Sequence, residues 1–205
     1  DTFEREMHAH AGCRAYVVDP TLRLSGLVSG SVRGPKASVA AFQRRLEAHG
    51  ATLNASLGVG DPKRGGSASV LRGAKHRSVR FQVVDLRTLL ADRYGPPPWR
   101  LGALKMDIEG DEASVLMQLS GLCASGDLHV SQLNVEMHAA PKWYPHAFRT
   151  VGELYGAMIG HALACGLLLH HKERNQWGCP AGECMEYAWV SLEHAKRVAL
   201  HGIRY

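Results

Sequence analysis

The stretch Leu104-Lys-Met-Asp-Ile-Glu-Gly-Asp-Glu-Ala-Ser-Val-Leu116 is the segment on which the fold assignment depends. Its apolar beginning predicts a strand, which leads directly into carboxylates and a glycine, and a helical pattern follows. In open α/β sheets, ligands bind outside the carboxyl ends of the strands. A carboxylate at that place can contact a cofactor, a metal or a substrate proton, so this stretch indicates a functional site.

Strand patterns and helix patterns alternate along most of the chain. Strands are expected at 13–18, 51–57, 79–84, 101–108, 129–137, 167–171 and 186–192, and helices at 38–49, 86–94, 111–122 and 147–165. The alternation predicts an α/β fold with a mainly parallel sheet and helices on both faces. Asp85 is expected to cap the helix that follows it. Residues 61–78, rich in Gly, Ser and basic side chains, are expected to form an exposed loop.

Length and composition predict one globular domain over residues 1–205. The chain is 45% apolar and 21% charged, which suits a domain with a substantial core. No apolar run reaches about 18 residues, so no transmembrane segment is predicted. The net charge is +5, but the basic residues are spread along the chain without interleaved aromatics, so nucleic acid is not an expected partner.

The chain contains five cysteines, at positions 13, 123, 165, 179 and 184. They form no CxxC pair, and the odd number leaves at least one thiol unpaired, so a disulfide scaffold is excluded. Cys179 and Cys184 could close a small loop disulfide, an alternative that the sequence leaves open. Zinc ligation by this pair with His170 and His171 is disfavoured because the spacing matches no usual zinc motif, and no metal site is predicted.

Two further segments come directly after strand patterns and are candidates for ligand binding. Gly58-Val-Gly60 lacks the third glycine of a dinucleotide-binding loop, because position 63 is Lys, and no helix pattern follows it. A turn is therefore expected there. Asp19 follows the strand pattern at 13–18 and can accept hydrogen bonds from both hydroxyls of a ribose. The alternative is a simple Asp-Pro turn with Pro20.

The acidic residues at 107–112 also have two interpretations. They can serve a functional site, as described above. Alternatively, Asp107 caps the following helix, while Glu109 and Glu112 interact with the positive amino end of that helix. The spacing alone does not decide between the two.

Glu136 and His138 lie two residues apart at the end of a strand pattern, so both project from one face together with Asn134. Polar groups on a buried strand are costly unless they are hydrogen-bonded or used. If they are used, Glu136 and His138 can orient a substrate hydroxyl and remove its proton, because His titrates near neutral pH. A structural hydrogen bond is the alternative.

Four segments, in this order, resemble the FkbM-type S-adenosylmethionine-dependent methyltransferases and the related methyltransferase-like proteins of animals and algae. They are Gly12-Cys-Arg-Ala-Tyr-Val-Val-Asp-Pro20, Leu57-Gly58 with Asp61, Leu104-Lys-Met-Asp-Ile-Glu-Gly-Asp-Glu112 with Val115-Leu116, and Gln132-Leu-Asn-Val-Glu-Met-His138. The third is similar to the family's K-hydrophobic-D-hydrophobic-E-G-x-E pattern and is the most specific. Cys184-Met-Glu-Tyr-Ala-Trp-Val190 is similar to the family's closing strand.

The resemblance implies a Rossmann-like fold of the class I methyltransferase type that binds S-adenosylmethionine. It implies that Asp19, with Pro20 beside it, contacts the ribose and that Leu57 and Gly58 lie near the adenine. The family's first strand and glycine-rich turn should precede residue 1. We therefore expect the chain to be truncated at its N-terminus and the parent protein to extend upstream.

For catalysis, the resemblance implies that Asp107 and Glu109 line the methyl-transfer end of the cofactor. Glu136 and His138 would face the acceptor. The expected activity is O-methyl transfer to a hydroxyl of a small molecule, glycan, lipid or protein, without a metal. Two alternatives stay open: an NAD-type oxidoreductase, and a catalytically inactive methyltransferase-like binding module.

Overall fold

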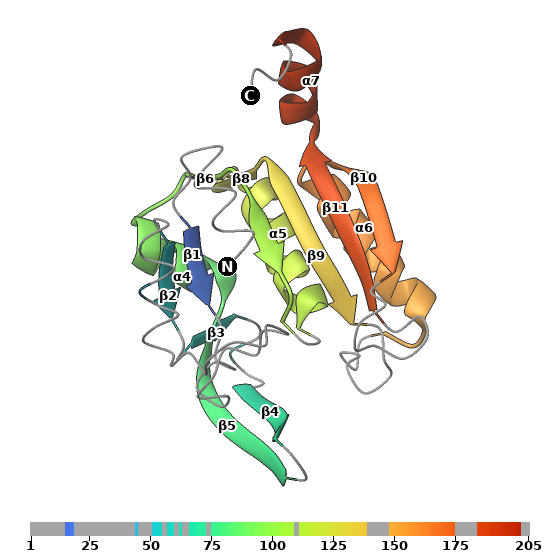
Figure 1. The fold of residues 1–205 in the computed structure, drawn as a ribbon. Coiled ribbons are helices and arrows are strands. Elements are labelled where there is room, and N and C mark those ends of the chain that lie inside the picture. Colours follow the sequence, from blue (N-terminus) through green and yellow to red (C-terminus); the bar gives the residue numbers. More distant parts are fainter. Residues whose placement is uncertain are drawn as a thin grey trace. The chain divides into compact units, whose positions relative to one another are not determined.

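The structure is a computed structural model, and it describes residues 15–18, 44, 51–54, 57–59, 62, 66–72, 75–108, 111–138, 148–174 and 184–201 (Figure 1). The chain divides into two compact units. The first comprises residues 1–58, 62–84 and 205, and the second comprises residues 59–61 and 85–204. The helix expected at 38–49 lies outside the described residues, apart from Arg44, which is helical.

In the first unit, two short strands pair in parallel. Strand β1 (Ala15–Val18) and strand β2 (Ala51–Asn54) are aligned so that Ala15 lies opposite Ala51. Both strands were expected from their apolar patterns. Parallel pairing requires a long connection between the two strands, and the chain supplies more than thirty residues between Val18 and Ala51.

A second sheet has the strand order β3-β5-β4. It consists of β3 (Leu57–Val59), β4 (Gly66–Arg72) and β5 (Lys75–Val84), and β4 pairs with β5 as an antiparallel hairpin. The expected exposed loop at 61–78 is therefore wrong over most of its length. Pairing of two strands in a hairpin satisfies the hydrogen bonds of their backbone groups independently of the side chains. A composition rich in Gly, Ser and basic residues therefore does not exclude strands.

The second unit is built on a four-stranded sheet of order β10-β11-β9-β7. Its strands are β7 (Leu104–Met106), β9 (Gln132–His138), β10 (Leu167–Arg174) and β11 (Cys184–Ser191). Strands β7 and β9 run parallel, whereas the β9–β11 and β11–β10 pairings are antiparallel. The fold is thus α/β with mixed sheets. A mainly parallel sheet is not confirmed.

A separate parallel pair consists of β6 (Trp99–Leu101) and β8 (Leu128–Val130). The sequence pattern predicts a single strand at 101–108 and another at 129–137, but each of these divides between two sheets. The break after β8 falls at Ser131, whose backbone N–H donates to Leu101 while its carbonyl accepts from Ser191. These bonds turn the chain from one sheet into the next.

Helices α4 (Leu86–Tyr94), α5 (Glu112–Ala124) and α6 (Val151–Ala164) confirm three of the expected helices, while α7 (Leu192–His201) is additional. The carboxylate of Asp85 accepts from the backbone N–H of Thr88 and caps α4, as expected. Gly166, with φ of 68°, ends α6 in the left-handed conformation that glycine adopts readily. Helices α5 and α6 lie on the same face of the four-stranded sheet (Figure 1).

The hydrophobic core of the second unit lies between α5, α6 and this face of the sheet. Its most completely buried side chains include Leu116 and Leu119 on α5, Leu133 on β9 and Ala162 on α6, each 0% exposed. The i, i+3, i+4, i+7 spacing of apolar residues along α5 turns one stripe of that helix toward the sheet. This packing fixes the amino end of α5 beside the ends of β7 and β9.

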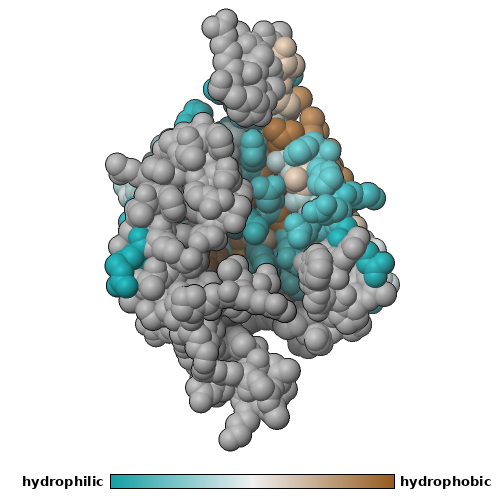
Figure 2. Space-filling model, in the orientation of Figure 1, coloured by the Kyte–Doolittle hydropathy of each residue, from teal (hydrophilic) through white to brown (hydrophobic). Residues whose placement is uncertain are grey.

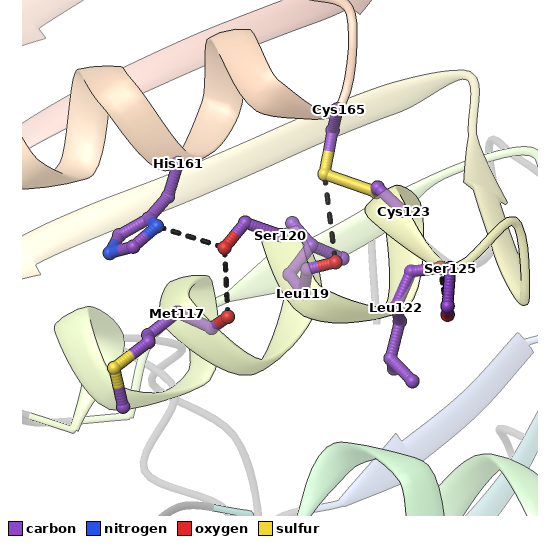
Figure 3. Close-up of a disulfide and its surroundings, with 8 residues drawn as sticks. All are labelled: Met117, Leu119, Ser120, Leu122, Cys123, Ser125, His161 and Cys165. Carbon is purple, nitrogen blue, oxygen red and sulfur yellow. Dashed lines mark hydrogen bonds between the residues drawn. A yellow bond between two sulfur atoms is a disulfide. The ribbon is translucent and has the colours of Figure 1, made fainter.

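A disulfide joins Cys123 of α5 to Cys165 at the end of α6 (Figure 3). Their Cα atoms are 5.2 Å apart, although 42 positions separate them in the sequence. Cys184 is disulfide-bonded as well. The sequence predicts no pairing of Cys123 with Cys165, so this disulfide was missed. The spacing of the cysteines in the sequence does not reveal the Cys123–Cys165 pair. The two sulfurs meet only because α5 packs against α6.

Candidate functional site

The candidate site lies where β7 and β9 end. Because these two strands are parallel and in register from Leu104–Leu133 to Met106–Val135, their carboxyl ends lie at the same edge of the sheet. Asp107 directly follows β7, and His138 is the last residue of β9. Asp107, Glu136 and His138, each a site residue predicted from the sequence, therefore lie at one edge of the sheet.

Strand β9 has one apolar face and one polar face. Leu133, Val135 and Met137 are each no more than 2% exposed and face the core. Glu136 and His138 alternate with them and belong to the opposite face, as the sequence predicts. In the view of Figure 2, hydrophilic residues gather on the face of the four-stranded sheet that is turned away from α5 and α6. The titratable side chains of β9, Glu136 and His138, therefore lie on the polar face of the sheet.

A buried hydrogen bond connects this strand to α5. The Nδ1 atom of His138 lies 2.9 Å from Oε1 of Glu112, and the two side chains are 6% and 1% exposed. The same Oε1 accepts a hydrogen bond of 3.1 Å from the backbone N–H of Ile108. Glu112 also lies in the first turn of α5, where the positive end of the helix dipole favours an anion. These three interactions explain how a carboxylate is tolerated in the core.

Contact with Glu112 determines the orientation of the His138 ring. A carboxylate accepts hydrogen bonds, so Nδ1 of His138 donates to Glu112, and Nε2 is the ring nitrogen on the side of Asp107 and Glu136. Nε2 lies 3.9 Å from Oδ1 of Asp107 and 3.9 Å from Oε1 of Glu136. The side chain of Asp107 is 45% exposed and that of Glu136 is 14% exposed, so the group opens toward solvent on the Asp107 side.

Additional carboxylates lie across the sheet from Glu136. In the strand register, Glu186 of β11 is directly opposite Glu136, and Glu173 of β10 is directly opposite Glu186. Like charges in directly opposed positions repel one another. The polar face of the sheet thus has an excess of negative charge beside His138, which favours a cationic ligand over an anionic one.

The remaining predicted site residues are described separately from this group. Asp19, Pro20 and Glu109 lie outside the described residues. Leu57 and Gly58 belong to β3 in the first unit, and Gly58 is buried. The assignment of these five residues to a cofactor stays a prediction.

Glu112 belongs to the site, although the sequence predicts for it only an interaction with the amino end of the helix. A signal for its burial was present, because Val115, Leu116 and Leu119 follow it at i+3, i+4 and i+7 and form the apolar stripe of α5. A glutamate at the first position of this apolar stripe is buried together with the rest of the stripe. Its partner, 26 residues away, could not be identified without the fold.

Helices α5 and α6 also carry a serine–histidine contact, which is structural. Nδ1 of His161 lies 2.9 Å from Oγ of Ser120, and this hydroxyl donates to the backbone carbonyl of Met117 at 2.8 Å (Figure 3). The serine proton is therefore directed away from His161, which is the wrong arrangement for a nucleophile activated by a base. Burial lowers the pKa of His161 below its ordinary value.

Three potential metal ligands also meet at the site. One ligand atom each from Glu136, His138 and Cys184 lie within 4.8 Å of one another. Because Cys184 is disulfide-bonded, its sulfur has no thiolate charge with which to bind a metal in this state. The disulfide-bonded form of the chain therefore offers only the nitrogen and oxygen ligands of this group.

Comparison with models of protein families, with curated proteins and with solved structures finds no match to the chain. The resemblance described above therefore rests on its motifs. Among the described helices, none combines the length and the apolar character needed to cross a membrane.

Proposed function

We propose that the chain is an S-adenosylmethionine-dependent methyltransferase that transfers a methyl group to a hydroxyl oxygen. The observation that carries the proposal is the position of His138 Nε2, 3.9 Å from a carboxylate oxygen of Asp107 and 3.9 Å from one of Glu136, where two parallel strands end. That edge of an α/β sheet is the usual location of a ligand site. We further propose a Rossmann-like fold of the class I methyltransferase type, with which the parallel β7–β9 pair and its crossover helix α5 are compatible.

The charges of the site fit the proposed cofactor. S-adenosylmethionine supplies a methyl group carried on a positively charged sulfur. Asp107 and Glu136 attract a cation near the end of β7, and the attraction is strongest on the partly buried side, where water screens it least. Asp107, with Glu109, would line the methyl-transfer end, while Asp19, Pro20, Leu57 and Gly58 would hold the adenosine part, as the resemblance implies.

His138 would deprotonate the acceptor hydroxyl, and Glu136 would orient it. Glu112 holds the His138 ring with Nδ1 protonated, so Nε2 can accept the hydroxyl proton as the oxygen becomes the nucleophile. Glu136, on the same strand face, can accept a hydrogen bond that orients the acceptor. Fixed placement of this kind lowers the barrier by aligning the oxygen lone pair about 3–3.5 Å from the carbon it attacks.

Equilibrium dialysis of the full-length protein with labelled S-adenosylmethionine, and separately with labelled NAD, tests the class of cofactor. We expect binding of S-adenosylmethionine and none of NAD. Binding of NAD without binding of S-adenosylmethionine would establish the oxidoreductase alternative and refute the proposal.

A transfer assay tests whether the protein is an enzyme or an inactive binding module. Full-length protein is incubated with methyl-labelled S-adenosylmethionine and fractionated small molecules, glycans, lipids and proteins, and the label is followed into each fraction. His138→Ala should lower transfer into the labelled fraction by about 10²–10⁴-fold, because a positioned acid–base group contributes about that much. The exposed Asp92→Asn variant on α4 serves as control and should leave transfer unchanged. Equal transfer by His138→Ala and wild type would contradict the assigned chemistry.

A further inference from the structure

Cys184 is located at the candidate site by the pairing of β11 with β9. It lies directly opposite His138 in the strand register and is only 2% exposed. Its sulfur lies within 4.8 Å of ligand atoms of both His138 and Glu136. A disulfide-bonded sulfur therefore adjoins the imidazole and the carboxylate that the proposed chemistry uses.

His138 is held as metal-binding histidines are held in proteins. Such a histidine almost always donates its other ring N–H to a carboxylate or a carbonyl, which fixes the ring and raises the basicity of the ligating nitrogen. Here Nδ1 of His138 contacts the buried carboxylate of Glu112, and Nε2 lies 3.9 Å from Oε1 of Glu136. In a tetrahedral zinc site, bonds of about 2.0–2.3 Å separate neighbouring ligand atoms by about 3.3–3.7 Å. The spacing at His138 and Glu136 is close to this range.

We propose that reduction of the Cys184 disulfide creates a zinc site formed by the Cys184 thiolate, His138 Nε2 and the Glu136 carboxylate. A dithiol reductant supplies two electrons and two protons, so the disulfide becomes two thiols while the reductant becomes a disulfide. Zinc then replaces the thiol proton of Cys184, which passes to solvent. In the oxidised protein the sulfur cannot ligate in this way, so the site depends on the redox state.

The ligand set selects the kind of metal. Thiolate and imidazole are preferred by Zn²⁺, whereas Mg²⁺ and Ca²⁺ prefer oxygen ligands alone. Three protein ligands also leave one tetrahedral position for water or a hydroxyl group. Bound zinc would occupy the nitrogen that the proposed function uses as a base, so zinc and acceptor deprotonation would compete. This consequence rests on the proposed function, whereas the zinc site itself does not.

The zinc site is tested by metal binding, which does not depend on any enzymatic activity. Full-length protein is dialysed against Zn²⁺ before and after reduction with a phosphine, with thiol counting to verify reduction, and bound metal is measured by mass spectrometry. A Cys123→Ser/Cys165→Ser background removes the other described disulfide. In that background we expect one additional zinc per chain after reduction. Cys184→Ser and His138→Ala should each abolish it, and Glu136→Gln should weaken it at least tenfold.

Cobalt provides a second measurement that structural damage would not mimic. Co²⁺ bound to the reduced protein should show a thiolate-to-cobalt charge-transfer band that Cys184→Ser removes while the far-ultraviolet circular dichroism stays unchanged. The proposal is refuted if the verified reduced protein takes up no additional zinc, if Cys184→Ser and His138→Ala retain it, or if the oxidised protein binds it equally well. None of these results bears on S-adenosylmethionine binding, so the two proposals can fail separately.

Discussion

Nδ1 of His138 lies 2.9 Å from Oε1 of Glu112, across 26 positions of sequence. This contact joins the end of β9 to the first turn of α5 and determines which ring nitrogen of His138 faces Asp107 and Glu136. One buried glutamate thus stabilises the fold and also orients the group to which we assign the proton transfer. The first prediction follows from this double role.

Glu112→Ala should lower the free energy of unfolding by about 3 kcal/mol, because it removes the acceptor of the buried N–H of His138 and of the partly buried N–H of Ile108. A double-mutant cycle with His138→Ala, followed by urea denaturation, should give a coupling energy of about 1–3 kcal/mol. Asp92→Ala, on the exposed side of α4, is the control and should change stability by less than about 0.5 kcal/mol. Additive effects of Glu112→Ala and His138→Ala would show that the contact contributes nothing.

Replacing both cysteines of the Cys123–Cys165 disulfide by serine should destabilise the protein by about 4 kcal/mol, because the bond closes a long loop in the unfolded chain. Thermal unfolding of the double variant and of wild type, both under oxidising conditions, measures the difference. The single variant Ser120→Ala, which removes the neighbouring hydroxyl and leaves the bond in place, should cost no more than about 1–3 kcal/mol. Equal stability of the double variant and wild type would contradict this role of the disulfide.

His161 should make stability depend on pH. Burial lowers its pKa in the folded protein below the ordinary value of 6.5, so the unfolded chain binds a proton at a higher pH than the folded chain does. Stability that is present above pH 6.5 should therefore be lost as the pH falls through the folded pKa, and the loss should level off below it. His161→Gln should reduce this slope when denaturation midpoints are compared between about pH 7.5 and 5. An unchanged slope would mean that other groups produce the dependence.

Glu186→Gln should stabilise the protein. Glu186 lies opposite Glu136 on one side and Glu173 on the other, so the change removes two repulsive cross-strand pairs. The expected gain is about 0.2–1 kcal/mol, measured by chemical denaturation at low salt, and it should shrink as salt is added. The neighbouring Tyr187→Phe change, on the other face of β11, removes no charge and should show no such salt dependence. A loss of stability in Glu186→Gln would indicate that this carboxylate has a favourable partner.

Much of the candidate site was predictable from local pattern. Alternation along β9 placed Glu136 and His138 on the face opposite Leu133, and parallel strands bring Asp107 to the same edge. The assignment of faces on β9 is confirmed by the burial of Leu133 and its apolar neighbours, because it depends only on strand periodicity.

The parts that were not predictable depend on contacts between distant segments. The Glu112–His138 pair and the Cys123–Cys165 disulfide form only when α5 packs against the sheet and α6. The hairpin of β4 and β5 was missed for a different reason, because backbone pairing can override a composition that is typical of loops. The mixed direction of the four-stranded sheet likewise follows from antiparallel pairing of β11, which no local pattern reveals.

The affinity of Asp107→Asn for S-adenosylmethionine, compared with that of Asp92→Asn, tests the central claim most directly. Both changes remove one carboxylate charge, but only Asp107 lies beside His138, 3.9 Å from its Nε2. Calorimetric titration of the full-length variants should give a dissociation constant at least about tenfold higher for Asp107→Asn, a loss of about 1.4 kcal/mol, and an unchanged constant for Asp92→Asn. Equal affinity in the two variants would contradict the claim that the cationic methyl donor binds where β7 and β9 end.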